Sequence, residues 1–167
     1  CGLMHPSKGQ VIVDGKQLGK DVDFAPDAGI IIETPCFLPY LSGFQNLKEL
    51  ASIRNIISKE EIAEAMEQVK LDPSSRKHVG KYSLGMRQRL GIAQAIMERP
   101  RYLILDEPMN GLDTQGMEDV RELLQKQKET GVTVILASHS MEDIRLLCDT
   151  VHRIQDASLI PCTTEFS

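Results

Sequence analysis

Apolar residues occur along the chain in short continuous runs and in longer stretches with helical spacing. The continuous runs predict strands at residues 10–13, 29–33, 102–106, 132–138 and 150–154. The run at 102–106 is apolar up to its last residue, and 132–138 is apolar and rich in β-branched residues. We therefore expect both of these strands in the core of a parallel sheet.

The helical spacing predicts five helices, several of them with capping residues at the start. They begin near residues 42, 58, 83, 114 and 140, and Ser58 with Glu61 forms a capping box. Apolar side chains recur every three or four residues on one face, as at Ile62, Ala65, Met66 and Val69. Strands alternate with helices from residue 82 onward, which predicts an α/β fold with a mostly parallel sheet and flanking helices.

Composition and charge are those of an ordinary globular domain. The chain has 167 residues, of which 41% are hydrophobic and 26% charged, and its formal net charge is −5. This charge argues against a nucleic-acid-binding surface. The sequence has no apolar run of the roughly 20 residues that span a bilayer. The four cysteines contain no C-x-x-C pair, so neither a zinc site nor a disulfide framework is indicated.

Two adjacent acids, Asp106 and Glu107, follow the apolar residues 102–105. In open α/β sheets, ligands bind beyond the carboxyl ends of the strands. Nucleotide hydrolases use an acid in this position to hold magnesium, and a second acid can polarise an attacking water. A charged turn after a strand would give the same two letters, so this pair alone does not decide the function.

Further motifs in a fixed order make the chain resemble the nucleotide-binding domain of ATP-binding-cassette (ABC) transporters. Residues 82–86 (YSLGM) match the signature motif, 103–107 (LILDE) the Walker B motif and 110–113 (NGLD) the D-loop, and His139 matches the switch histidine. The resemblance runs from about residue 1 to 160. It implies a partial P-loop NTPase-like ABC ATPase core with an inserted helical subdomain.

This resemblance also implies a role for each matching residue. Glu107 would be the general base, and His139 would contact the γ-phosphate of ATP. Asp106 and Glu33 would bind the Mg²⁺ shell. The start of the signature helix would contact a nucleotide held by a second domain in a head-to-tail dimer, and Asp113 would couple the two sites, so the nucleotide-binding residues are Ser83, Leu84, Gly85, Met86, Asp113 and Glu33.

The chain departs from the family pattern at a few of these positions. Leu84 and Met86 replace residues of the usual Leu-Ser-Gly-Gly-Gln signature, and Glu33 stands where the family has the Gln of the Q-loop. The stretches around Glu33 and the signature are most similar to the subfamily that exports, or confers resistance to, peptide antibiotics such as bacitracin and lantibiotics.

No stretch of the chain matches the phosphate loop G-x-x-x-x-G-K-[ST]. In the family this Walker A loop precedes a phrase like the one at residues 1–15, so we expect the sequence to be the C-terminal part of a nucleotide-binding domain. The parent protein would be an ATPase, and this part alone would be weakly active or inactive. We also expect the missing strand and helix to leave apolar surface and an open sheet edge.

The resemblance divides the chain into four parts and suggests its partners. Residues 1–41 would belong to the N-terminal lobe with the Q-loop-like segment, 42–100 to the helical subdomain, 101–160 to the RecA-like core and 161–167 to a tail. A membrane-spanning transporter subunit would dock near residues 34–55. The domain would then be cytoplasmic and peripheral to the inner face of the cell membrane, with ATP and Mg²⁺ as cofactors and no nucleic acid as a partner.

Two other functions fit the same motifs. Soluble members of the superfamily act on ribosomes or DNA ends, but DNA-end members insert a long coiled coil that the roughly fifty residues between Glu33 and Ser83 cannot hold. Ribosome-acting members carry two cassettes and a charged linker, and no such linker is visible. A non-catalytic module that binds an intact cassette through its signature surface is the second alternative.

Overall fold

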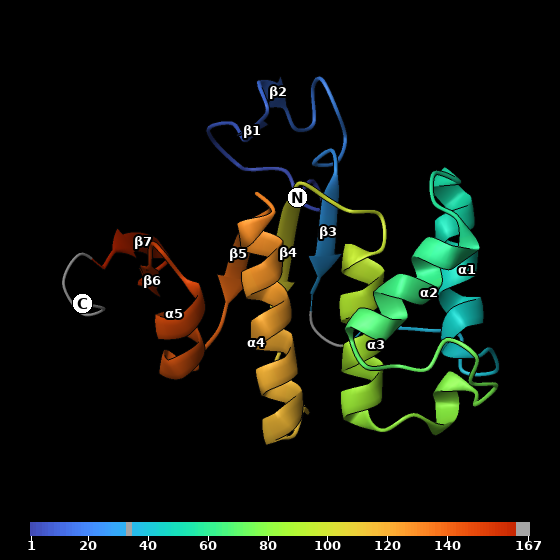
Figure 1. The fold of residues 1–167 in the computed structure, drawn as a ribbon. Helices are drawn as coiled ribbons and strands as arrows, with labels where there is room; N and C mark the ends of the chain where they lie inside the picture. The colour runs from blue at the N-terminus through green and yellow to red at the C-terminus, as the bar shows by residue number, and fades with distance from the viewer. Residues whose placement is uncertain (33–34, 163–167) are drawn as a thin grey trace.

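A three-stranded parallel sheet forms the centre of the computed structural model, which describes residues 1–32 and 35–162. Its strands are β3 (Ala28–Ile31), β4 (Tyr102–Asp106) and β5 (Thr133–Ala137), in the order β3-β4-β5 (Figure 1). The expected α/β fold with a parallel sheet is therefore confirmed. All three strands point their carboxyl ends toward the same edge of the sheet.

Helices cover the sheet and fill the stretch between β3 and β4. The structure contains α1 (Gly43–Arg54), α2 (Lys59–Gln68), the 3₁₀ helix η1 (Val79–Lys81), α3 (Leu84–Ile96), α4 (Thr114–Glu129) and α5 (Met141–Leu147). In the part of the chain that the structure describes, no helix is both long and apolar enough to cross a membrane. The predicted mostly helical stretch at 42–100 is present, while its division into a separate subdomain stays a prediction.

Side-chain caps set the starts of these helices. Ser42 and Ser58 each form a full capping box, with Gln45 and Glu61 respectively, so the box predicted at Ser58 is confirmed. Caps of this kind contribute about 1 kcal/mol each to stability. They place the first turn of each helix at a defined residue, which in turn sets the face that the helix buries.

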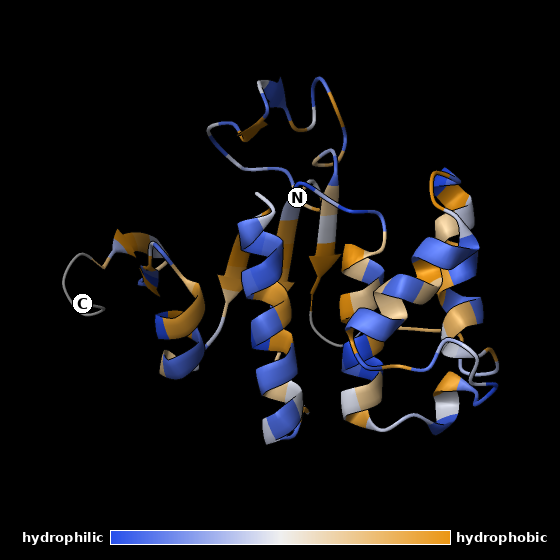
Figure 2. Ribbon diagram, viewed as in Figure 1, coloured by the Kyte–Doolittle hydropathy of each residue, from blue (hydrophilic) through white to orange (hydrophobic). Residues whose placement is uncertain are grey.

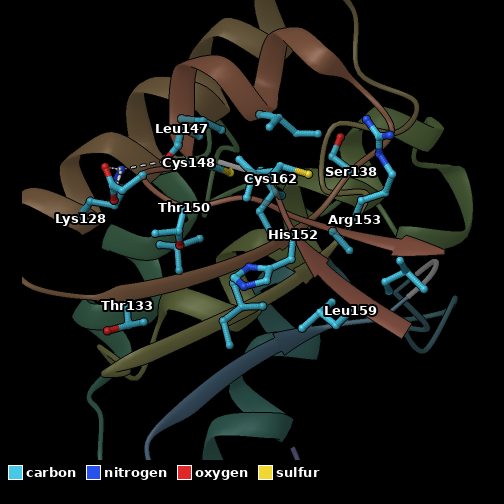
Figure 3. A pocket seen from close by; sticks show the side chains of 18 of the residues that line it. Lys128, Thr133, Ser138, Leu147, Cys148, Thr150, His152, Arg153, Leu159 and Cys162 are labelled. Atoms are coloured by element: carbon cyan, nitrogen blue, oxygen red, sulfur yellow. Dashed lines mark hydrogen bonds and ion pairs between the residues drawn. The ribbon is translucent and has the colours of Figure 1, made fainter. Parts of the chain in front are cut away.

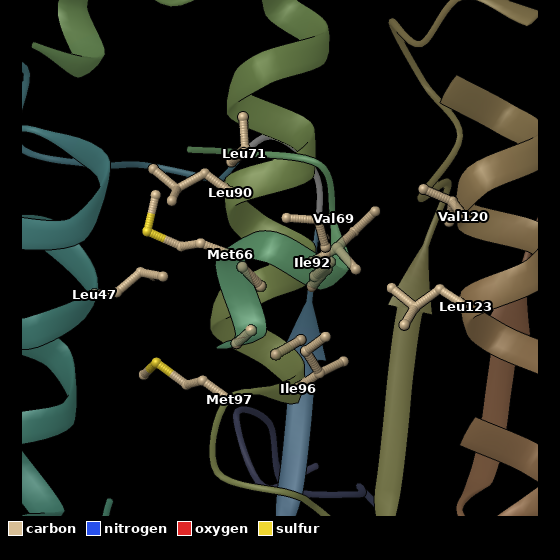
Figure 4. Close-up of a cluster of buried hydrophobic side chains, with 14 of the residues drawn as sticks. Leu47, Met66, Val69, Leu71, Leu90, Ile92, Ile96, Met97, Val120 and Leu123 are labelled. Carbon is tan, nitrogen blue, oxygen red and sulfur yellow. The ribbon is translucent and has the colours of Figure 1, made fainter. Parts of the chain in front are cut away.

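Helix α3 lies between the sheet and the helices α1 and α2 (Figure 1), and its buried side chains belong to the main core. Leu90 is fully buried with Leu47 of α1 and Met66 of α2, and Ile92 is 1% exposed (Figure 4). The backbone of α3 comes close to β3, because a Cβ at Gly29 would overlap the Ala95 carbonyl. Glycine at this position therefore allows the close packing of α3 on the sheet.

The two hairpins lie outside the parallel sheet. β1 (Ile12–Val13) and β2 (Lys16–Gln17) pair across a turn formed by Asp14 and Gly15. The strand predicted at 150–154 is present as β6 (His152–Gln155), but it pairs antiparallel with β7 (Ser158–Pro161), a strand that we did not predict. Its turn consists of Asp156 and Ala157, both at positive φ. Without glycine, this turn carries no clear sequence signal.

Strand β5 is an edge strand, so the expectation that it lies in the core was wrong. Across residues 1–32 and 35–162 no strand pairs with its outer side. Ile135 in its centre is 56% exposed, although the strand is coloured as hydrophobic in Figure 2. The apolar sequence of β5 is typical of a buried strand, but the sheet that the described residues form leaves the outer side of β5 exposed.

A groove of about 950 Å³ opens beside this edge. It is lined by β5, α5 and the β6–β7 hairpin (Figure 3). Leu147 and Cys148 lie on the α5 side, and His152 and Leu159 on the hairpin side. The chain thus has an exposed apolar groove and an open sheet edge, as we expected.

The open edge predicts self-association that a charge should suppress. Unpaired strand edges with apolar side chains are templates for further pairing, and an inward-facing lysine blocks it. We expect the chain to form larger species as its concentration rises, and Ile135→Lys to reduce them, as measured by light scattering after size exclusion. Ile53→Lys is the matched control, since Ile53 is 79% exposed on α1. An equal effect of both variants would show that general solubility, not the edge, is responsible.

Candidate functional site

The β4–β5 register sets the position of the two acids. Asp106 is the last residue of β4 and pairs with Ala137 of β5. The next residue, Glu107, continues the contact, because its N–H donates to the Ala137 carbonyl at 2.9 Å. Glu107 has φ +46°, a left-handed backbone that is uncommon outside glycine and asparagine. The chain therefore turns sharply at the end of the buried strand.

The Glu107 carboxylate contacts His139, two residues beyond β5. Its Oε1 accepts the backbone N–H of His139 at 2.9 Å and lies 2.7 Å from the ring Nδ1. The His139 ring is 81% exposed, whereas the Glu107 side chain is 29% exposed. The hydrogen bond to Glu107, and then its negative charge, raise the pKa of His139 above its usual value.

Asp106 stands beside this pair as the candidate magnesium ligand. Within residues 1–32 and 35–162, no three His, Cys, Asp or Glu side chains gather in a way that could hold a metal ion. Mg²⁺ in nucleotide sites is commonly held by one or two carboxylates together with phosphate oxygens and water. A single strand-end aspartate fits that chemistry. Glu33, the other expected ligand, lies outside the described residues.

The signature residues form the start of α3. Ser83 is the N-cap, and its Oγ accepts the Met86 N–H at 3.2 Å. The N–H groups of Leu84 and Gly85 belong to the first helical turn, which has no intrahelical acceptor for them. Ser83 and Leu84 are exposed. This end of α3 lies on the same side as the carboxyl ends of the strands (Figure 1), and it is suited to bind an anion.

The D-loop packs directly against the signature. A Cβ at Gly85 would lie 2.9 Å from the Gly111 carbonyl, and the Leu84 side chain covers Gly111, which has φ +75°. Asp113 caps α4, because its Oδ1 accepts the Gly116 N–H at 2.9 Å. Glycine at 85 and 111 therefore permits a close approach that larger residues would prevent.

The structure thus brings some of the predicted residues together and separates others. Glu107 and His139 are in contact beyond the ends of β4 and β5, and Asp106 precedes Glu107 as the last residue of β4. Among the described residues, no hydrogen bond or ion pair joins the signature residues 83–86 to Glu107 or His139. The roles of these residues in binding ATP and metal stay predictions.

Sequence reasoning missed two polar groups that hold the site. Gln88, 3% exposed, donates from Nε2 to the Pro108 carbonyl at 3.1 Å. Arg121 of α4 binds Asp143 of α5, whose side chain is 2% exposed, and this fixes the helix after His139. A signal for Gln88 was present: it shares a helix face with Ile92 and Ala95, so it is a polar residue in an apolar row.

Comparison with known proteins decides the family. A family model described as ABC transporter matches residues 1–110. The chain belongs to the ABC transporter ATP-binding family. The domain is 44% identical to the uncharacterised ABC transporter ATP-binding protein YybJ of Bacillus subtilis. The 148 aligned residues make up 89% of this chain and 68% of YybJ.

Two relatives of this ABC transporter domain carry names that state a cargo. It is 40% identical to the bacitracin transport ATP-binding protein BcrA of Enterococcus faecalis, over 95% of this chain and 52% of BcrA. It is 33% identical to the lantibiotic transport ATP-binding protein SrtF of Streptococcus pyogenes, over 95% of this chain and 68% of SrtF. The chain therefore spans only about half the length of BcrA.

Solved ABC structures have the same fold. The ATP-binding cassette MJ0796, solved as a dimer in a post-hydrolysis state bound to ADP and Pi, superimposes with a TM-score of 0.80 at 20% identity, over 94% of this chain and 73% of that chain. CbiO1 of Clostridium perfringens, described as part of the ABC transporter complex cbiONQ, gives 0.76 at 26% identity, over 95% and 67%. The ABC ATPase fold is thus shown.

The contact between Glu107 and His139 predicts a titration in this ABC domain. Glu107→Gln should lower the pKa of His139 toward its ordinary value of about 6.5, as followed by NMR of the imidazole. Because the folded-state pKa is raised, the pair stabilises the fold fully below the unfolded value and loses this contribution as pH rises through the folded pKa. His5→Gln is the control. An unchanged His139 pKa in Glu107→Gln would contradict the contact.

Proposed function

We propose that this chain is the catalytic and signature part of an ABC transporter ATPase subunit that uses ATP hydrolysis to power the transport of a peptide antibiotic across a membrane. The observation that carries the proposal is the pairing of Glu107 with His139 next to Asp106 at the carboxyl ends of two parallel strands. Family membership supplies the reaction class, and the names of BcrA and SrtF suggest the cargo class.

In this proposal Glu107 accepts the proton of the attacking water. Its Oε1 is occupied by the two contacts with His139, and we assign the proton from water to Oε2. The backbone N–H of His139 holds the carboxylate in place whatever the charge of the ring. Because the His139 ring is 81% exposed, it is available to contact the terminal phosphate of ATP.

The metal role falls to Asp106. Magnesium supplies charge that neutralises the phosphate oxygens during transfer. The rigid end of β4 fixes the Asp106 carboxylate for this purpose, and Leu105 next to it is 1% exposed, so the strand cannot shift easily. Glu33 is proposed as a further ligand, although it lies outside the described residues.

The signature end of α3 is proposed to serve a second cassette. Ser83 and Leu84 are exposed, and within residues 1–32 and 35–162 no hydrogen bond or ion pair joins them to the Glu107–His139 pair, so they can face a nucleotide held by another domain. The MJ0796 cassette forms a dimer bound to ADP and Pi, and CbiO1 is part of a transporter complex. We therefore propose a head-to-tail dimer of nucleotide-binding domains and a membrane-spanning subunit as partners.

The proposed transporter assembly implies a location for this chain in the cell, and the family resemblance implies its division into parts. We propose that it lies in the cytoplasm, peripheral to the inner face of the cell membrane, with the membrane subunit near residues 34–55. In this scheme 1–41, 42–100, 101–160 and 161–167 are the N-terminal lobe remainder, helical subdomain, RecA-like core and tail. Asp113, which caps α4, would transmit changes between the two nucleotide sites.

The absence of a phosphate-loop pattern in these 167 residues predicts weak activity. Without backbone N–H groups and a lysine around the β- and γ-phosphates, ATP should bind poorly. In a steady-state assay with magnesium, we expect turnover far below the usual enzyme range of about 1–10³ per second. Turnover within that range, abolished by Glu107→Gln, would overturn the proposed inactivity and at the same time support Glu107 as the base.

The exposed signature predicts ATP-dependent binding to a complete cassette. We expect a heterodimer with an intact relative such as YybJ when ATP is present, measured by light scattering after size exclusion. Ser83→Asp should abolish it, because aspartate keeps the helix cap but repels phosphate. Ser83→Asn is the matched control, since asparagine caps equally well without charge. Equal binding by both variants would refute the phosphate contact at Ser83.

A further inference from the structure

The turn after β4 depends on a hydrogen-bond donor from helix α3. Within the turn, the Glu107 carbonyl accepts the Asn110 N–H at 3.1 Å, and the Met109 carbonyl accepts the Leu112 N–H at 3.2 Å. The carbonyl between them, that of Pro108, accepts Gln88 Nε2 at 3.1 Å. Among the described residues, no backbone N–H donates to this carbonyl, although it is buried with the rest of the turn. A side chain of α3 completes it.

This hydrogen bond is buried at both ends. Gln88 is 3% exposed, and the Pro108 side chain is among the most completely buried in the described chain. A buried amide or carbonyl without a partner is costly, and a hydrogen bond away from water is stronger than one at the surface. The bond is therefore expected to hold its two elements at a fixed distance.

The same face of α3 contacts the D-loop one turn earlier. Leu84 lies four residues before Gln88 and packs on Gly111, while Gly85 approaches the Gly111 carbonyl. The signature end of α3 and the segment from Glu107 to Gly111 are thus in contact over two helical turns. A shift of one should move the other.

We propose that Gln88 is a positioning residue, whose buried bond to the Pro108 carbonyl fixes the turn that carries Glu107 and thereby sets the Glu107 carboxylate at His139. Its consequence for catalysis rests on the proposed function: the helix that presents Ser83 to one nucleotide would then be tied to the general base that acts on another. The geometric part is independent of any nucleotide.

Gln88→Met tests this geometry, because methionine keeps the length and the apolar contacts but lacks the donor. In NMR spectra of the full 167-residue chain without nucleotide, we expect the His139 amide signal to shift and its hydrogen exchange to rise by about tenfold or more, as Glu107 leaves its place. The Thr133 amide, which donates to the Arg101 carbonyl at the far end of β5, is the internal reference. Its exchange should change far less.

Arg89→Met is the matched control variant. Arg89 also links α3 to other elements, through Asp119 of α4 at 2.8 Å and the Val69 carbonyl at 2.9 Å, and neither of these bonds involves the turn after β4. It should destabilise the chain to urea while leaving the His139 amide shift unchanged.

Two results would overturn the proposal. One is an unchanged His139 signal in Gln88→Met; the other is an equal rise in exchange at His139 and Thr133, which indicates only general loss of stability. If Gln88→Met does not fold, Gln88→Asn, which withdraws the donor by one methylene, is read by the same criteria. Because this experiment uses no ATP, a negative result would refute the role of Gln88 but not the proposed ATPase function. Conversely, the role of Gln88 can be tested even if the protein does not hydrolyse ATP.

Discussion

The pairing of β4 with β5 is the constraint on which the candidate site depends. The two strands are in register from Tyr102–Thr133 to Asp106–Ala137, and the Glu107 N–H extends the ladder by one bond. A slip of one residue would turn each side chain to the opposite face. The apolar residues of β4 therefore do more than form a core: they determine that the carboxylate of Glu107 meets His139.

Helix α3 connects the turn after β4 to helices α1 and α2. Its buried face carries Leu90 and Ile92 into the core, while Gln88 on the same helix reaches the turn after β4. Because protein interiors are closely packed and not easily deformed, a helix held by both apolar and polar contacts moves as a unit. The exposed N-terminal end of α3 at Ser83 and the buried Gln88 thus belong to one rigid helix, although one is in solvent and the other in the core.

Much of this arrangement was predictable from local sequence signals. The cap at Ser58, the helix that begins near 114 and the acidic end of the strand at 102–106 follow from short-range rules, and the structure confirms the cap, the helix and the strand. The resemblance placed Glu107 and His139 in one nucleotide site, but their direct contact was not predicted, because it depends on strand order, which is a long-range property. The position of β5 at the edge and the β6–β7 hairpin were missed, since an apolar strand gives no sign of which neighbours it has and the Asp156-Ala157 turn lacks glycine.

The two members of the central pair have unequal support. Glu107 follows a strand that is paired on both sides, and its turn is held by Gln88. His139 follows β5, whose outer side is unpaired within the described residues and whose Ile135 is exposed to water. Local opening is easiest where few apolar contacts are buried, so the His139 side of the pair should open first. Any element that pairs with β5 and fills the groove would bury Ile135 and hold His139 more firmly at the carboxylate. Filling that groove would therefore stabilise the geometry of the site.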